Sequence, residues 1–164
     1  MPSSIADERA GVDMLYSSGT TGRPKGVKVP LPVEEAIDAT NNLVVLAAMA
    51  FGINADSIYL SPAPLYHAAP LRWSMTIHRL GGTVVLMKKF DARGFLELAE
   101  RERATNTMLV PVQYRRIMAL EDFDRFDLSS FVVKYCTSAP FPAALKAEVL
   151  KRWPRSEERR VGKE

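Results

Sequence analysis

A loop rich in glycine and hydroxyl residues lies in the stretch YSSGTTGRPKGV, residues 16–27. Gly19, Gly22 and Gly26 can adopt backbone angles that let N–H groups approach a ligand closely, and successive N–H groups form a nest for an anion. Lys25 adds a mobile positive charge. The spacing is not that of a Walker loop, which has Ser or Thr directly after the lysine. The loop predicts phosphate binding, and the competing interpretation is a flexible turn with a solvated lysine.

Two other short segments carry polar groups directly after a predicted strand. PAPLYH, residues 62–67, contains His67, and TSAP, residues 137–140, contains Ser138. In open α/β sheets, ligands bind beyond the carboxyl ends of the strands. We therefore expect both segments to line one rim together with the glycine loop. The competing interpretation for a single histidine in such a loop is a structural role.

The elements that would position these loops alternate between strand and helix. Short apolar or β-branched runs predict strands, and longer amphipathic runs predict helices. The predicted strands are 13–18, 57–64, 82–90, 107–112 and 131–139, and the predicted helices are 33–52, 71–82, 92–104, 113–121 and 142–153. Alternation of this kind implies parallel strands with helices packed on the sheet. The sequence thus predicts an α/β fold with a doubly wound, largely parallel sheet.

Composition and charge argue against several classes of protein. The chain has 164 residues and a net charge of +3, but its acidic and basic residues interleave, so we expect no nucleic-acid partner. The longest apolar run, 43–53, is well short of the roughly 20 residues that cross a membrane, which leaves only peripheral association open. A single cysteine, Cys136, and a first segment unlike a signal peptide lead us to expect a cytoplasmic protein.

The glycine loop resembles the phosphate-loop signature of the adenylate-forming (AMP-binding) superfamily, which includes acyl-CoA synthetases, firefly-type luciferases and peptide-synthetase adenylation domains. PLYHAAPL, residues 64–71, is similar to the second motif of that family. DLSSFVVKYCTSAPFPAALKAEVL, residues 127–150, is similar to the segment before its adenine-binding loop. The resemblance covers nearly all of 13–154 and is closest to bacterial fatty-acyl-CoA synthetases.

The resemblance implies roles for particular residues. Lys25 and the loop before it would bind the β- and γ-phosphates of ATP, and Thr20 would help to place Mg²⁺. His67, with Lys25 an implied catalytic residue, would lie near the attacking carboxylate or gate the acyl tunnel. A short segment after the last predicted strand would pack on adenine through its backbone, although the family usually has glycine where this chain has Ser138. The implied ATP-binding residues besides Lys25 are Ser17, Ser18, Gly19, Thr20, Thr21 and Gly22 for the phosphates, and Ser138, Ala139 and Pro140 for adenine.

The implied activity is the ATP-dependent conversion of a carboxylic acid, by resemblance a fatty acid, to an acyl-adenylate and then to a coenzyme A thioester. The implied ligands are ATP, Mg²⁺, coenzyme A and the small-molecule acid. Two alternatives stay open: an aryl-acid or peptide-synthetase adenylating enzyme, and a nucleotide-binding module without catalysis. Two roles also stay open for Trp73, which could line an acyl tunnel or pack in the core.

Several family motifs are not found in the chain, including Tyr-Gly-x-Thr-Glu and the late catalytic lysine. We therefore expect residues 13–154 to be part of the N-terminal portion of a larger adenylation domain, inactive alone, preceded by a flexible lead at 1–12. The final RSEERRVGKE, residues 155–164, is what a widely used DNA-sequencing adapter encodes when it is read in frame. We expect this tail to be an artefact, and the competing interpretation is a charged terminal segment.

Overall fold

The computed structural model describes residues 11–16, 22–31, 36 and 39–153. The chain divides into two compact units, Met1–Asn42 and Leu43–Glu164. Of the terminal segments predicted from the sequence, residues 1–10 and the tail 155–164 lie outside the described residues.

The first unit contains a short antiparallel strand pair on either side of the glycine loop. Strand β1 (Leu15–Tyr16) pairs with β2 (Gly26–Val27), with Leu15 opposite Val27. The predicted strand at 13–18 is therefore shorter than expected within its described residues. It belongs to an antiparallel pair with β2 and not to the parallel sheet.

The second unit is built on a four-stranded parallel sheet in the order β4–β3–β5–β6. The central pair is held in register by Tyr59 opposite Asn106 and Leu60 opposite Thr107. This arrangement confirms the predicted α/β fold with a largely parallel sheet. The strands are β3 (Ile58–Ser61), β4 (Thr83–Leu86), β5 (Asn106–Leu109) and β6 (Val133–Cys136).

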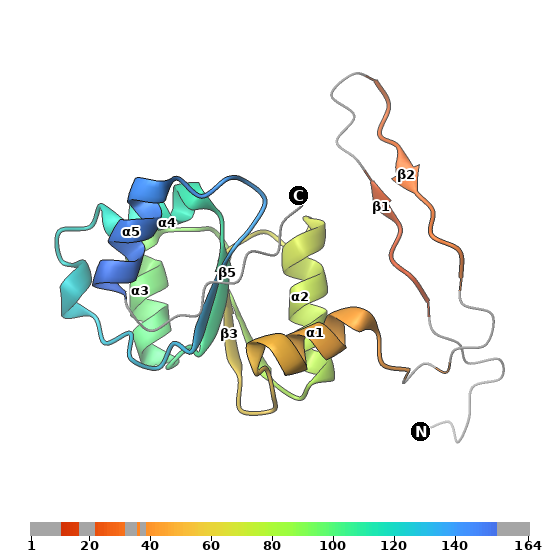
Figure 1. Ribbon diagram of the computed structural model, residues 1–164, viewed down its shortest axis with the longest axis horizontal. Coiled ribbons are helices and arrows are strands. Elements are labelled where there is room, and N and C mark those ends of the chain that lie inside the picture. The colour runs from red at the N-terminus through yellow and green to blue at the C-terminus, as the bar shows by residue number, and fades with distance from the viewer. Residues whose placement is uncertain (1–10, 17–21, 32–35, 37–38, 154–164) are drawn as a thin grey trace. The chain divides into compact units, whose positions relative to one another are not determined.

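Helices cover both faces of this sheet, which makes the unit doubly wound. Helices α1 and α2 pack on one face, and α3, α4 and α5 pack on the opposite face (Figure 1). The helices of the described chain are α1 (Asn42–Phe51), α2 (Ala68–Arg79), α3 (Ala92–Arg101), α4 (Pro111–Met118) and α5 (Ala143–Arg152), with a 3₁₀ turn η1 (Phe123–Arg125) after α4.

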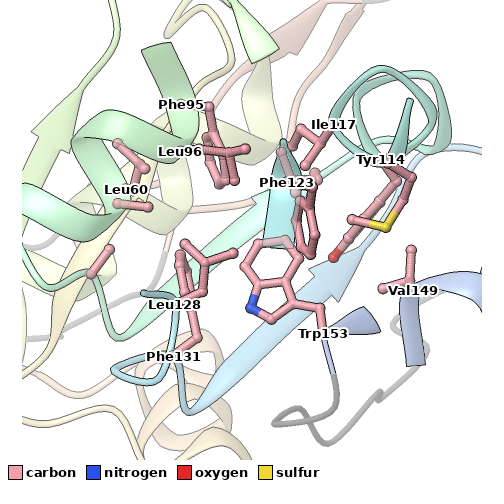
Figure 2. Packing of buried hydrophobic residues seen from close by; sticks show 14 of the residues in the cluster. Leu60, Phe95, Leu96, Tyr114, Ile117, Phe123, Leu128, Phe131, Val149 and Trp153 are labelled. Atoms are coloured by element: carbon pink, nitrogen blue, oxygen red, sulfur yellow. The ribbon is translucent and has the colours of Figure 1, made fainter. Parts of the chain in front are cut away.

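Two hydrophobic cores flank the sheet because side chains alternate between its faces along each strand. Tyr59 of β3 packs with α1 and α2, and its neighbour Leu60 packs with α3, α4 and α5. In the α3–α5 core, the Trp153 ring makes an edge-on contact with Phe131, with ring centroids 4.8 Å apart (Figure 2). The α1–α2 core is smaller and contains Ala47, Phe51, Ile53, Tyr59, Trp73, Ile77, Val133 and Tyr135.

The starts of helices α1 and α2 differ from the sequence prediction by three residues or more. Helix α1 begins at Asn42, and the described residues 36 and 39–41 of the predicted helix 33–52 are not helical. Thr and Asn side chains compete for backbone groups and favour helix starts, which accounts for the late beginning at Asn42. Helix α2 begins at Ala68, earlier than predicted, because Pro70 lies in its first turn, where no intrahelical N–H donor is needed.

Candidate functional site

A pocket lies at the carboxyl edge of the sheet, where a doubly wound fold binds its ligands. The chain leaves β3 toward α2 on one face and leaves β5 toward α4 on the opposite face, so these two strands form the topological switch point. The pocket, here called the rim pocket, has a volume of about 410 Å³. Its lining consists of Ala63, His67, Ala68, Ala69, Pro70, Met108, Val110, Gln113, Thr137 and Ser138.

His67 lies at the rim pocket because it is the residue directly before helix α2. Its backbone is extended, with φ −85° and ψ 141°, and its side chain makes no capping hydrogen bond. The backbone fixes the turn instead: the His67 N–H donates to the Pro64 carbonyl at 3.2 Å, and the His67 carbonyl accepts from Leu71 N–H at 3.3 Å. The imidazole is exposed beside the Tyr66 ring, at 4.5 Å between centroids.

Gln113 is a lining residue that the motif analysis did not single out. It is largely buried, and its side-chain Oε1 accepts a hydrogen bond from Val110 N–H at 3.0 Å. The Gln113 N–H in turn donates to the Val110 carbonyl at 2.9 Å, which fixes the first turn of α4 after Pro111. The sequence feature that could have identified Gln113 as a lining residue is its position shortly after strand β5.

Two helices begin at the rim pocket, and their N-terminal ends determine the sign of the electrostatic potential there. The first turns of α2 and α4 include Ala68 and Gln113, both in the pocket lining. Helix N-termini carry partial positive charge on their unpaired N–H groups. The rim pocket is therefore electrostatically suited to an anionic group such as a carboxylate.

Ser138 lies in the loop after β6 with φ +70°, in the left-handed region that favours glycine. The family resemblance places a glycine at this position, and this backbone angle supplies the physical reason for it. The exposed residues Ala139 and Pro140 follow and are not part of the rim-pocket lining. Their contact with adenine stays a prediction.

The structure brings two of the predicted site residues together, because His67 and Ser138 both line the rim pocket. Gly22 and Lys25 are described and exposed in the first unit, next to β2. The remaining loop residues, Ser17, Ser18, Gly19, Thr20 and Thr21, lie outside the described residues. That the glycine loop shares this rim stays a prediction.

No described residues fit a metal site by themselves. Across residues 11–16, 22–31, 36 and 39–153, no group of three or more His, Cys, Asp or Glu side chains could hold a metal ion. Thr20, the predicted Mg²⁺ residue, lies outside these ranges. In the same ranges, no helix has both the length and the apolar character that a membrane span requires.

Comparison with protein families matches residues 2–161 to the family described as AMP-binding enzyme. The chain belongs to the AMP-binding enzyme family. Feruloyl-CoA synthase of an Amycolatopsis species is 36% identical over 143 residues, covering 85% of this chain and 27% of that protein. Medium/long-chain-fatty-acid–CoA ligase FadD8 of Mycobacterium tuberculosis is 34% identical over 143 residues, covering 87% of this chain and 24% of that protein.

A solved AMP-binding structure has the same arrangement of elements. The ATP-bound MatB of Rhodopseudomonas palustris superposes with a TM-score of 0.70 and 25% sequence identity, covering 84% of this chain and 26% of that one. These matches confirm the family resemblance seen in the sequence. The chain spans about a quarter of the length of the curated relatives it matches, and those relatives act on different acids.

Proposed function

We propose that the protein containing this chain activates a carboxylic acid with ATP and transfers the acyl group to coenzyme A. The observation that carries the proposal is the rim pocket, where an AMP-binding chain brings His67 and Ser138 together at the switch point of its sheet. The proposed acid has a long apolar body. A fatty acid is the candidate that the sequence resemblance favours, and an aryl acid is the alternative suggested by the feruloyl-CoA synthase relative.

In this proposal the rim pocket holds the reacting carboxylate. The partial positive charge at the starts of α2 and α4 attracts that group, and His67 lies beside it. A carboxylate oxygen attacks the α-phosphorus of ATP, and the bond from this phosphorus to pyrophosphate breaks. The coenzyme A sulfur then attacks the acyl carbon, and AMP leaves with the electrons of the bond to the carbonyl.

The glycine loop has an electrostatic role in the proposal. Its N–H groups and Lys25 stabilise the negative charge that develops on the departing pyrophosphate, and nothing covalent is required of the loop. Mg²⁺, with Thr20 as its proposed contact, supplies further neutralisation of the phosphate charge when it is bound. The backbone of residues 138–140 is the proposed adenine platform.

We also propose a cytoplasmic location and small-molecule partners. The single cysteine of the chain, Cys136, supports a reducing compartment, because disulfide-rich composition marks secreted domains. Interleaved acidic and basic residues support the absence of a nucleic-acid partner.

Lys25→Ala in the complete enzyme tests the proposal. ATP–pyrophosphate exchange is expected to fall on the order of a hundredfold, the usual effect of removing one charge-stabilising donor. The matched control is Lys28→Ala, which removes an exposed lysine just after β2. Equal exchange rates for the Lys25→Ala variant and the unmodified enzyme would remove Lys25 from the role proposed for it.

A further inference from the structure

Gln113 is the buried polar side chain in the lining of the rim pocket. The described lining contains four polar residues, His67, Gln113, Thr137 and Ser138, and Gln113 is 8% exposed, whereas the other three are half-buried or exposed. A carboxamide has an acceptor oxygen and a donor NH2 group, and burial favours a partner for each of them. The partners of these two groups therefore indicate which kind of ligand suits the pocket.

The backbone before α4 sets the orientation of the Gln113 carboxamide. The Val110 N–H can only donate, so the atom that lies 3.0 Å from it is the acceptor Oε1, and the NH2 group forms the other end of the carboxamide. Among the residues that the structure describes, Nε2 makes no hydrogen bond. Nε2 also keeps accessible surface, unlike the fully enclosed partnerless atoms of the cores. A ligand in the rim pocket can therefore reach this donor group.

Hydrogen bonds hold the Gln113 donor group in place before a ligand arrives. The Gln113 N–H donates to the Val110 carbonyl at 2.9 Å, so the side chain and the backbone of Gln113 both fix the start of α4. The next residue, Tyr114, is 1% exposed, and its hydroxyl donates to the Tyr135 carbonyl at 3.1 Å, which ties α4 to strand β6. A donor that is already ordered loses little conformational entropy when a ligand binds to it.

The surroundings of Nε2 favour an anionic oxygen as its partner. Both N–H groups of Nε2 donate, and the starts of α2 and α4 add the partial positive charge of helix N-termini. The described lining of the rim pocket contains no Asp or Glu side chain that could compete for these donors. A hydrogen bond to a charged acceptor is also stronger than one to a neutral acceptor. The donor group is therefore suited to a carboxylate oxygen.

We infer that Gln113 binds the carboxylate of the acid, with Nε2 donating to one carboxylate oxygen while the other oxygen attacks ATP. The inference rests on the proposed function, because it takes the carboxylate to lie in the rim pocket. A carboxamide does not ionise, so it holds the carboxylate without giving up a proton and leaves the attacking oxygen negatively charged. Gln113 thereby distinguishes an acid from an uncharged compound with the same body.

Gln113→Glu separates carboxylate binding from the role of Gln113 at the start of α4. One carboxylate oxygen of the new side chain can accept from the Val110 N–H as Oε1 does, so the helix start is retained. The second oxygen replaces the donor Nε2 by a negative charge, which repels the carboxylate of the acid. A residue with a structural role alone would tolerate this change, whereas a carboxylate-binding residue would not.

Calorimetric titration of the complete enzyme without ATP measures the effect. The probes are two matched pairs, octanoate with octanol and phenylpropanoate with phenylpropanol, which represent the fatty and the aryl candidates. The unmodified enzyme is expected to bind the acid of at least one pair about tenfold more tightly than its alcohol. Gln113→Glu is expected to weaken binding of that acid on the order of a hundredfold and to change binding of its alcohol by about threefold or less.

Two further variants serve as a control and as a second test. Val112→Glu is the control, because Val112 is 51% exposed, lies in the first turn of α4 and is not part of the rim-pocket lining. It adds the same charge near the same helix start and is expected to change acid binding by about threefold or less. Gln113→Met removes the donor, is expected to weaken acid binding about tenfold, and carries the test if Gln113→Glu does not fold.

Four results would overturn the inference. They are no tighter binding of either acid than of its alcohol by the unmodified enzyme, acid binding that Gln113→Glu leaves unchanged, equal weakening of the acid and its alcohol by Gln113→Glu, and equal weakening of acid binding by Gln113→Glu and Val112→Glu. Acid-dependent ATP–pyrophosphate exchange tests the proposed function separately. A complete enzyme without such exchange would contradict the proposed function, whereas acid binding that Gln113→Glu leaves unchanged would overturn the role of Gln113 alone.

Discussion

Ser138 is a residue that holds a backbone conformation suited to glycine. Its φ of +70° brings Cβ close to the following carbonyl, at a cost of roughly 1–2 kcal/mol for an L-residue. It also lines the rim pocket next to Thr137, whose N–H donates to the Leu109 carbonyl at 3.2 Å. Strained backbone of this kind is characteristic of ligand sites, where the surrounding structure holds it in place.

Ser138→Gly is expected to stabilise the chain by about 0.5–1 kcal/mol. Relief of the left-handed strain exceeds the greater conformational entropy that glycine has in the unfolded chain, which is roughly 0.5–1 kcal/mol. Urea denaturation of both proteins measures the difference. The control is Ala139→Gly, where φ is not positive and only the entropic loss applies. A Ser138→Gly protein less stable than the unmodified chain would contradict the strain argument.

At the scale of single residues, the sequence predicted part of the lining of the rim pocket. His67 and Ser138 were expected at one rim from their positions after strands, and both line the rim pocket. Gln113 was missed because its contribution depends on a hydrogen bond to Val110 that fixes its side chain at the pocket. Such local geometry is not encoded in residue type alone.

At the scale of elements, Lys134 joins strand β6 to the end of helix α5. The residue is 2% exposed, and its Nζ donates to the Trp153 carbonyl at 2.7 Å. The Nζ also lies 4.3 Å from the centroid of the Trp153 ring. A cation is favoured beside a helix C-terminus and over an indole ring. Burial nevertheless has the larger effect, and it lowers the pKa of Lys134 to about 7.

The lowered pKa of Lys134 predicts a stability that rises with pH. Above about pH 7 the folded chain releases the Lys134 proton, whereas the unfolded chain keeps it up to its ordinary pKa of 10.5. Since the unfolded state then binds more protons, the free energy of unfolding increases by up to about 1.4 kcal/mol per pH unit. Lys134→Met is expected to remove this rise between pH 7 and pH 9.

Urea denaturation of both proteins at pH 7, 8 and 9 measures how the free energy of unfolding changes with pH. Lys151→Met is the control, because Lys151 is an exposed lysine on α5, the helix whose end Lys134 contacts. It is expected to leave the slope unchanged. A Lys134→Met protein whose stability rises with pH as steeply as the unmodified chain would rule out the assigned origin of the slope.

The sequence predicted the elements of the parallel sheet well and the first unit poorly. Strand–helix alternation identified β3 to β6 and the helices between them, since each helix packs on the sheet through a clear apolar face. The pairing of β1 with β2 was not predicted, because two-residue strands carry no periodic signal. The start of α1 was placed too early, because the apolar pattern gave no weight to Asn42 as a helix boundary.

At the scale of the whole molecule, the chain exposes an apolar stripe on α1. Met49 is 84% exposed and Val45 is 47% exposed, four residues apart on one side of the helix. Edge strand β4 adds exposed Leu86. Contiguous apolar surface and unpaired sheet edges favour association between chains.

The isolated chain is therefore expected to self-associate at micromolar concentration. Analytical ultracentrifugation measures its mass, and Val45→Lys combined with Met49→Lys is expected to shift the distribution toward monomer. Met75→Lys serves as control, because Met75 is an exposed methionine on α2. A chain that is monomeric without any substitution would show that the α1 stripe is too small to drive association.

The two cores lie on opposite faces of one sheet, so substitutions can alter one core without touching the other. The core that contains Trp153 lies beneath α3, α4 and α5, and the core that contains Trp73 lies beneath α1 and α2. Adjacent strand residues such as Tyr59 and Leu60 belong to different cores. Substitutions at well-separated positions without shared contacts have nearly additive effects. Substitutions in one core are therefore expected to change the free energy of unfolding independently of substitutions in the other core, so that the two faces of the sheet can diverge separately.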